Sequence, residues 1–482
     1  MTDLTTLTLV QMQMGLNKRE FSSRELVQAA LDRISKFDSS LHAFLHIPSE
    51  SALKQADEAD KNRQPDKPLQ GIPIAIKDVL MVESLPCTCG SKILEGFIAP
   101  YTATSVKRLK AAGAIIIGKT NTDEFAMGSS TENSAYGVTH NPWDVTRVPG
   151  GSSGGSAAVV AARYVPAALG TDTGGSVRQP ASLCGVTGLK TTYGRVSRYG
   201  LVAFGSSLDT VGAFGRSAED VAVIFSIMAG HDQKDATSVN QPVPQINFDM
   251  NAVRGLRVGV PKQYFITGIQ PEVEEKTRAA IDMLKDLGAE IREISLPHTE
   301  YALPVYYIIA PAEASANLAR YDGIRYGPRA DTDNLLDVFF KTRGQKFGAE
   351  VARRIMIGTY ALSAGYYDAY YGQAQKVRTL IQRDFENAFK DVDVIAAPTA
   401  PTTAFKIGEH VNDPLAMYLE DVFTLPANLA GVPGISFNVG FDKKNLPIGM
   451  QLIGPHFRED LLLRATHTYQ QVTDWHKQQP PL

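Results

Sequence analysis

Apolar residues along this chain fall into short continuous runs, separated by longer stretches in which apolar and polar positions follow a helical period. The runs in "GIPIAIKDVL" (71–80) and "AIIIGK" (114–119) each predict a buried strand. Between them, "TSVKRLKAAG" predicts a helix that Gly113 ends. Ser22 and Glu25 have the spacing of a capping box, which predicts a helix over the following "LVQAALDRI". Short strands between helices indicate an α/β fold.

A strand, a helix and a second strand follow one another in the middle of the chain. "RGLRVGVP" (254–261) predicts the first strand, Pro271 begins the helix, and "AEIREISLP" (289–297) predicts the second strand. This order is typical of a βαβ unit, whose two strands are parallel. Further strands are predicted in "DVDVIAAPTAP" (391–401) and "LPIGMQLIG" (446–454). The sheet is therefore expected to be parallel or mixed.

The bulk composition is that of a globular protein and excludes several classes of protein. Hydrophobic residues make up 44% and charged residues 21% of the 482, as in ordinary soluble domains. The formal net charge of -3, from 48 basic and 51 acidic residues, argues against a protein that holds a polynucleotide mainly by itself. The sequence shows no secretory pattern and no apolar run of about 20 residues, the length that a bilayer span needs.

The chain has three cysteines, at positions 87, 89 and 184. An odd and sparse set of this kind does not make a disulfide framework and indicates a reducing compartment. Cys87 and Cys89 are too close together, and too far from other ligands, to suggest a zinc site. We therefore expect a cytoplasmic protein with no metal site of its own.

Two clusters of small residues, "GGSSGGS" (150–156) and "TDTGGS" (171–176), lie inside the α/β pattern. A flexible linker is disfavoured, because "AAVVAARYVPAALG" (157–170) follows directly and predicts a helix. A phosphate-binding P-loop requires a lysine that this stretch lacks. Asp172-Thr173-Gly174 resembles the triplet of aspartic proteases, but that chemistry needs a second carboxylate and no second triplet occurs.

Two serine-based mechanisms remain for this segment. Gly150–Gly154 satisfies the Gly-x-Ser-x-Gly pattern of a nucleophile elbow, which must follow a strand and needs a catalytic histidine. The preceding "NPWDVTRVP" is polar, and none of the late histidines has a recognisable catalytic context. The alternative is a serine with a lysine base. Lys77 ends an apolar run, where desolvation lowers a lysine pKa, although it could instead simply pair with Asp78.

Taken together, three residues and their spacing resemble the amidase signature family. They are Lys77 in "IPIAIKD", Ser152 in "GGSSGGS" and Ser176 in "GTDTGGSVRQPA"; 75 positions separate the first two and 24 the last two. The resemblance is strongest over residues 22–470. It implies a single amidase-signature domain over residues 1–482, an α/β fold with a central mixed β-sheet flanked by helices.

The resemblance also assigns roles. Ser176 is expected to be the acyl nucleophile, Ser152 the bridging serine, and Lys77 the base. The peptide bond before Ser152 is expected to be cis. The backbone N–H groups of Thr173, Gly174 and Gly175, with that of Ser176, are candidates for the oxyanion hole.

Glutamine is the substrate that the resemblance implies, and it needs a cation for its carboxylate and an anion for its ammonium. The family motif places Arg354, in "RRIM", on the carboxylate and Asp421, in "MYLEDVF", on the ammonium. Tyr307 is a weaker candidate for the same pocket. Arg353 remains an alternative to its neighbour, and either arginine could be a surface residue.

Several segments, among them "RRIMIGTYALSAGYYDAYY", are similar to the glutaminase subunits of tRNA-dependent amidotransferases within the family. The similarity implies that glutamine is hydrolysed through a glutamyl-serine ester and that the ammonia serves transamidation of Glu-tRNA(Gln), Asp-tRNA(Asn) or both. It implies a heterotrimer with subunits B and C, in which the partner subunit uses ATP and Mg²⁺ and binds most of the tRNA. No cofactor is expected in this chain. A stand-alone amidase and a catalytically inactive scaffold are the alternatives.

Overall fold

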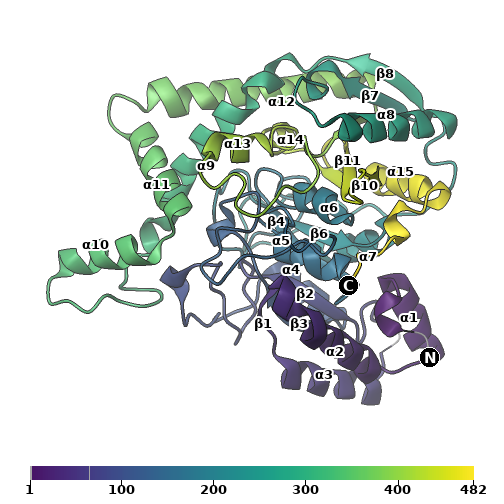
Figure 1. The fold of residues 1–482 in the computed structure, drawn as a ribbon, viewed down its shortest axis with the longest axis horizontal. Helices are drawn as coiled ribbons and strands as arrows, with labels where there is room; N and C mark the ends of the chain where they lie inside the picture. The colour runs from purple at the N-terminus through teal and green to yellow at the C-terminus, as the bar shows by residue number, and fades with distance from the viewer. Residues whose placement is uncertain (1–2, 65) are drawn as a thin grey trace.

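A mixed β-sheet forms the centre of the molecule, with helices on both of its faces (Figure 1). The computed structural model describes residues 3–64 and 66–482. Within them, eleven strands pair in the order β1-β3-β2-β4-β6-β5-β10-β11-β9-β7-β8. The strands are β1 (Phe44–His46), β2 (Pro73–Lys77), β3 (Ile115–Thr120), β4 (Ala167–Asp172), β5 (Thr187–Lys190), β6 (Thr210–Gly215), β7 (Arg257–Pro261), β8 (Glu290–Ile294), β9 (Val394–Pro398), β10 (Gly434–Phe441) and β11 (Pro447–Ile453).

Helices pack on both sides of this sheet; α9 packs against α11 and α12, α12 runs along the top of the view, and α10 projects at the left (Figure 1). No helix in the described ranges combines the length and apolar character that crossing a membrane would take. The helices are α1 (Leu9–Lys18), α2 (Ser23–Leu41), α3 (Ser49–Lys61), α4 (Thr104–Ala111), α5 (Gly154–Ala161), α6 (Arg178–Cys184), α7 (Ala218–Met228), α8 (Pro271–Asp286), α9 (Ala302–Asn317), α10 (Leu335–Lys346), α11 (Ala349–Leu362), α12 (Gln373–Asp391), α13 (Pro414–Leu419), α14 (Leu425–Ala430) and α15 (Glu459–Val472).

Most of the elements predicted from the hydrophobic pattern are confirmed. The capping box forms as expected, because Ser22 and Glu25 exchange side-chain and backbone hydrogen bonds at the start of α2. The predicted βαβ unit is β7-α8-β8, and its two strands are parallel. The fold class is thus the expected one, an α/β protein with a central mixed sheet.

The helix predicted over residues 157–170 is wrong in its second half. Helix α5 ends at Ala161, and the "AALG" that follows is the beginning of strand β4. Arg163 has a positive φ of 58°, and Pro166 cannot continue a helix because its ring clashes with the preceding turn. The apolar composition of this stretch is equally suited to a buried helix and a buried strand, so the pattern alone did not reveal the boundary.

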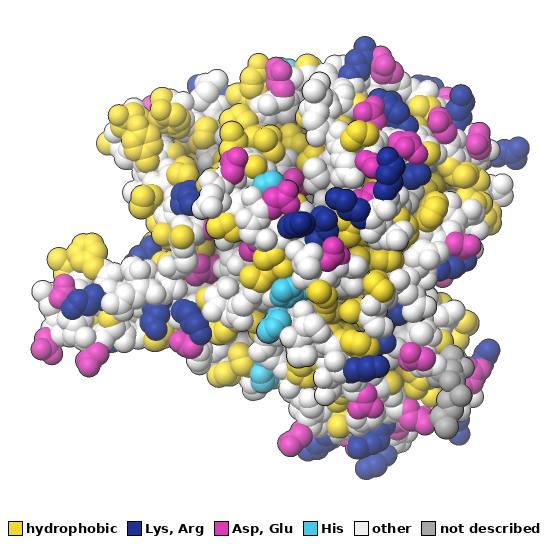
Figure 2. All heavy atoms as spheres, viewed as in Figure 1, with side chains coloured by type: hydrophobic (Ala, Val, Ile, Leu, Met, Phe, Trp, Pro, Cys, Tyr) yellow, Lys and Arg dark blue, Asp and Glu magenta, His cyan; other side chains and the backbone are white. Residues whose placement is uncertain are grey.

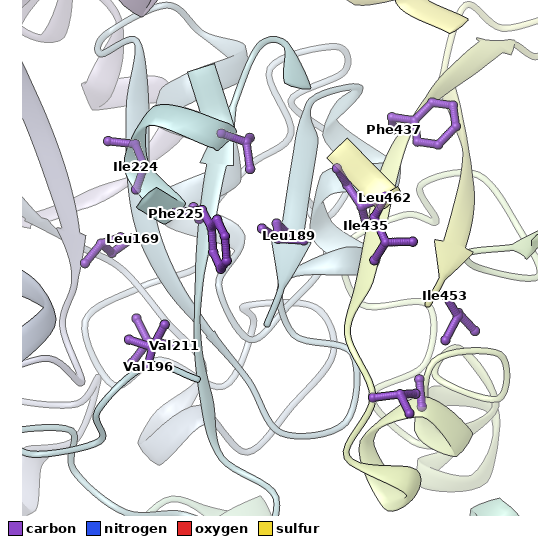
Figure 3. Close-up of a cluster of buried hydrophobic side chains, with 14 of the residues drawn as sticks. Leu169, Leu189, Val196, Val211, Ile224, Phe225, Ile435, Phe437, Ile453 and Leu462 are labelled. Atoms are coloured by element: carbon purple, nitrogen blue, oxygen red, sulfur yellow. The ribbon is translucent and has the colours of Figure 1, made fainter. Parts of the chain in front are cut away.

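Side chains alternate between two cores on opposite faces of the sheet. On one face, apolar residues from the central strands pack against α7 and α15 (Figure 3). On the other face, α5 covers β2 and β4 and packs with Ala75, Ala168 and Phe214. The residues drawn for the first core include Leu169, Leu189, Val211, Ile224, Phe225, Ile435, Phe437, Ile453 and Leu462.

Strands β2 and β4 are parallel neighbours, third and fourth in the order of the sheet, with Ile76 opposite Leu169. Their carboxyl ends therefore lie side by side at one edge. Lys77 ends β2, and the "TGGS" segment begins directly after β4. Open α/β sheets commonly bind ligands at this edge, so the topology alone brings two of the predicted site segments together.

Candidate active site

Lys77 is completely buried at the end of β2 and faces hydroxyl groups. Its Nζ lies 2.8 Å from Ser152 Oγ, 2.8 Å from Ser153 Oγ and 2.9 Å from Thr171 Oγ1. Burial lowers the pKa of Lys77 from its ordinary value to about 7, although the nearby Asp123 carboxylate acts in the opposite direction. An amine in this environment can accept a proton near neutral pH.

The alternative in which Lys77 only pairs with Asp78 does not hold in the structure. The Asp78 carboxylate instead accepts a hydrogen bond from Lys119 Nζ at 2.8 Å, and both of these side chains are buried. Asp78 also accepts bonds from the backbone and hydroxyl of Thr88. The Asp78 carboxylate therefore has other partners, and the amine of Lys77 instead contacts Ser152.

The first Gly/Ser segment is a buried part of the core and does not act as a linker. Every residue from 150 to 156 is buried, and α5 begins within the segment at Gly154. The peptide between Gly151 and Ser152 is cis, as the resemblance implied. No strand precedes Ser152 in the described residues 121–151, so the nucleophile-elbow interpretation lacks the strand that it requires.

Ser176 lies in the loop after β4 and, at 7% exposure, is the accessible member of the predicted triad; Lys77 and Ser152 are at 0%. The carbonyl groups of the loop around Ser176 accept hydrogen bonds from other parts of the protein. Gly174 O accepts from Thr424 Oγ1 at 2.7 Å, Gly175 O accepts from a backbone amide at 2.8 Å, and Ser176 O accepts from Ser153 N at 3.3 Å.

The amide N–H groups of Gly174, Gly175 and Ser176 donate no hydrogen bond to any described residue. Gly175 has a φ of 140°, which favours glycine, and an added Cβ would overlap the Thr424 side chain. A loop with bonded carbonyls and free amides can stabilise a negative oxygen. The geometry is therefore that expected of an oxyanion hole, while its role stays a prediction.

Neighbouring polar contacts hold this loop from both ends. Thr173 Oγ1 donates to Asp209 at 2.7 Å, and Asp209 also accepts two backbone amides. At the end of β4, the Arg178 guanidinium pairs with Asp172 at 3.3 Å, with both side chains completely buried. The Arg178 guanidinium and the other groups around Asp172 hold the pKa of that carboxyl below its usual range despite burial. These bonds restrict where Ser176 can lie.

Arg354 is the buried member of the arginine pair, with 3% exposure. Its guanidinium lies 5.2 Å from the ring centre of Tyr307 and 5.5 Å from that of Tyr418, and its Nε donates to Glu350 at 2.7 Å. Arg353 is exposed and pairs with Glu350 from outside. The structure therefore favours Arg354 over Arg353 as an internal cation.

Asp421 is buried in the same region and is hydrogen-bonded to Ser129. Burial raises the pKa of Asp421 to about 8, while the Ser129 hydroxyl and the Arg354 guanidinium act to lower it. Tyr307 stacks on Tyr418 with ring centres 3.9 Å apart, and its hydroxyl is buried without a partner among the described residues. A buried carboxyl group, a guanidinium and a phenol without a partner among the described residues thus share one region.

A cavity of about 160 Å³ opens beside these residues. Its lining includes Gly128, Ser130, Glu350, Arg353, Arg354 and Tyr418. A larger hollow of about 700 Å³ lies between α1, α2 and α3, but none of the predicted site residues lines it. Of the predicted residues, the smaller cavity is lined by Arg354 and its alternative Arg353, so it marks the arginine side of the site and does not reach the predicted triad.

Four contributors to this site were missed from the sequence: Ser129, Ser153, Thr171 and Glu350. Ser153 directly follows Ser152 and Thr171 lies two positions before Thr173, and this closeness in sequence was the one available signal for them. Ser129 lies 292 positions from Asp421, and no spacing rule relates the two. Glu350 is also far in sequence from Tyr418, but it lies four positions before Arg354 on α11, and that helical spacing was a signal. By contrast, the geometry brings together Lys77 and Ser152 as the resemblance implied.

Known proteins similar to this chain match it over nearly its whole length. A family model described as Amidase matches residues 25–463. The A subunit of the glutamyl-tRNA(Gln) amidotransferase of Roseiflexus sp. (strain RS-1) is 60% identical over 485 residues, which cover 100% of this chain and 99% of that protein.

Two solved structures show the same similarity in three dimensions. The A subunit of the glutamyl-tRNA(Gln) amidotransferase of Thermotoga maritima is 43% identical, with a TM-score of 0.82 over 98% of this chain and 96% of that one. The native peptide amidase of Stenotrophomonas maltophilia is 30% identical, with a TM-score of 0.82 over 98% of each chain. The identity is thus higher to these amidotransferase proteins than to the peptide amidase.

Proposed function

This chain belongs to the amidase family, and from this premise we propose that it is the glutamine-hydrolysing subunit of a tRNA-dependent amidotransferase. The observation that carries the proposal is the buried amine of Lys77, which contacts Ser152 beside the loop that holds Ser176. The similarity to the glutamyl-tRNA(Gln) amidotransferase proteins supports the choice of substrate and acceptor. The ammonia released here is used to amidate misacylated Glu-tRNA(Gln), and Asp-tRNA(Asn) is the further acceptor to be tested.

The reaction begins with proton transfer toward the lysine. Neutral Lys77 accepts the Ser152 proton while Ser152 takes the proton of Ser176, and the Ser176 oxygen attacks the side-chain carboxamide carbon of glutamine. The oxyanion that forms is held by the free amides of the Gly174–Ser176 loop. The carbon–nitrogen bond then breaks, the nitrogen takes back a proton and leaves as ammonia, and a glutamyl ester remains on Ser176. Water hydrolyses this ester with the same proton relay and releases glutamate.

Substrate recognition rests on the opposite charges of a free amino acid. Arg354 pairs with the α-carboxylate of glutamine and Asp421 with its α-ammonium, while the Tyr307 hydroxyl donates into the same pocket. Burial in a low-dielectric pocket strengthens each contact. An amidase for uncharged amides would gain little from such a pair, which favours an amidotransferase component over a stand-alone amidase.

Assembly with other subunits is supported by exposed hydrophobic surface. Figure 2 shows hydrophobic side chains gathered where Figure 1 draws α10 and the connection between α11 and α12. Surfaces of this kind mark protein contacts. The partners are subunits B and C of a cytoplasmic heterotrimer, in which the partner subunit uses ATP and Mg²⁺ and holds most of the tRNA. The exposed residues are Leu335, Leu336, Phe340, Met356, Ile357, Tyr360, Tyr366, Tyr367 and Tyr370.

The proposed function is tested by purifying the full chain from its own cells with the proteins that accompany it. Glutamine hydrolysis should increase when misacylated tRNA and ATP are added to the assembly. A stand-alone amidase would instead show the same rate with the isolated chain and respond to neither addition. An inactive scaffold would release no ammonia from glutamine under any of these conditions.

Arg354→Ala and Asp421→Ala should each reduce kcat/KM for glutamine by roughly 10- to 150-fold. The reason is that each removes a charged hydrogen bond, worth about 1.5–3 kcal/mol. Steady-state glutaminase kinetics measure the loss. Acylation of Ser176 by a small activated ester that lacks both charges should keep its rate.

Arg353→Ala is the matched control, because it removes an adjacent exposed guanidinium. This variant should retain normal glutamine kinetics. If Arg354→Ala and Asp421→Ala left glutamine use unchanged, the assignment of the pocket would be wrong. A parallel loss in ester-driven acylation would indicate a folding defect instead of a missing substrate contact.

Glutaminase activity should fall as the pH decreases through about 7. Lys77 must be unprotonated to act as base, and burial places its pKa at about 7, so activity is present above this value and lost below it. The midpoint of the pH profile should lie at a higher pH for kcat/KM than for kcat. In the free enzyme, burial raises the pKa of Asp421 to about 8. In the complex, the bound ammonium group of glutamine keeps the Asp421 carboxylate ionised. Rates between about pH 5.5 and 8.5 test both statements; a flat kcat profile would contradict a lysine base.

A further inference from the structure

Thr424 contacts the backbone of the nucleophile loop from a segment 250 residues away. Its side chain is completely buried, and its hydroxyl donates to Gly174 O at 2.7 Å. The same hydroxyl lies 3.0 Å from Asp421 O. It also packs against the Cα of Gly175, where an added Cβ would overlap it. A hydroxyl in this position controls the peptide group between the two glycines.

The direction of that peptide group decides where one amide hydrogen points. The bond between Gly174 and Gly175 is trans, since the cis bond of the described residues is the one before Ser152. In a trans peptide, the C=O and the following N–H point in opposite directions within one plane. Thr424 holds the Gly174 carbonyl toward itself, so the Gly175 N–H points away from Thr424. That N–H is one of the amides with no acceptor among the described residues.

Glycine flexibility makes this external support necessary. Gly174 and Gly175 carry no side chain to restrict rotation, and Gly175 already has a positive φ of 140°. A peptide between two glycines can rotate with little steric cost, and such a rotation would withdraw the N–H from the reacting oxygen. Thr424 is itself held, because its carbonyl accepts from Arg178 Nη2 at 3.0 Å and its amide donates to Asp421 O at 2.9 Å.

We propose that Thr424 is a positioning residue that directs the Gly175 N–H into the oxyanion hole. This inference rests on the proposed function, because it concerns the same hydrolysis of glutamine. Thr424 acts through the backbone and touches neither the attacking serine nor the substrate. Its effect therefore belongs to the step in which negative charge develops on the carboxamide oxygen, and binding of glutamine in its ground state does not depend on it.

Thr424→Val removes the hydroxyl and keeps the shape, and it should lower kcat by roughly 100-fold, the usual cost of one oxyanion donor. The KM should change little, and glutamine should bind a Ser176→Ala chain with the same Kd whether or not Thr424→Val is added. Acylation by the small activated ester should decrease by the same factor as glutamine hydrolysis, since both reactions form an oxyanion. Thr424→Ser keeps the hydroxyl and should recover most of the rate.

Thr399→Val is the matched control, because Thr399 is also completely buried and its hydroxyl is hydrogen-bonded to the Ser436 hydroxyl at 2.9 Å. It should have near-normal kinetics. If Thr424→Val weakened glutamine binding but left ester acylation normal, Thr424 would support the Asp421 contact and the inference would be overturned. Equal losses in Thr424→Ser and Thr424→Val would also overturn it. Absence of glutaminase activity in the unmodified assembly would instead refute the proposed function.

Discussion

Ser176→Ala should reduce glutamine-dependent amidation by on the order of 10⁶-fold, the loss that removal of the nucleophile produces in another serine enzyme. Ser176 is the accessible hydroxyl of the predicted triad, and no ester can form without it. Ammonia-dependent amidation in the same assembly should be retained, because added ammonia replaces the product of this chain. Both rates are measured on the assembly with misacylated tRNA and ATP.

The two rates together separate a catalytic effect from a structural one. Removal of one hydroxyl creates little space in the core, so Ser176→Ala should unfold at close to the normal temperature. Ser156→Ala is a suitable control, because Ser156 is a buried serine on α5 whose hydroxyl bonds Leu169 O. Equal loss of both activities in a folded Ser176→Ala assembly would show that this chain does more than supply ammonia.

Lys77→Ala should also remove glutaminase activity, and Lys77→Arg should fail to restore it. Arginine keeps the positive charge but does not lose its proton in proteins, so it cannot receive the proton of Ser152. The expected loss is at least about 10³-fold for both variants, by analogy with removal of the base in other serine enzymes. Glutaminase rates at about pH 8, where the lysine is largely neutral, provide the measurement.

Lys190→Met is the matched control for Lys77. Lys190 is also completely buried, and burial lowers the pKa of Lys190 to about 7. Its amine, however, donates to the carbonyls of Thr191 and Val432 and contacts no serine among the residues described. Lys190→Met should keep its glutaminase rate if it folds. A near-normal glutaminase rate in Lys77→Arg would show that Lys77 serves as a structural cation and does not act as the base.

Much of this protein is determined locally, by its sequence alone. The runs around Lys77 and residues 114–119 became strands, and Ser22 with Glu25 began a helix, because burial and hydrogen-bond capping act over a few residues. The three predicted triad positions were chosen from their motifs and spacing, and their catalytic roles stay predictions. The stretch over residues 157–170 was ambiguous, since a fully apolar run lacks the periodicity that distinguishes a helix from a strand.

Only the tertiary structure decided which side chains meet. From sequence, Lys77 could pair with Asp78 or contact Ser152. The parallel pairing of β2 with β4 places hydroxyl groups beside Lys77. Lys119 on β3 forms an ion pair with Asp78. Ser129 meets Asp421 across 292 positions. The physical reason is that a hydrogen-bond partner and a desolvation energy depend on which strands and helices become neighbours. That choice is made by packing of the whole chain, and local patterns do not contain it.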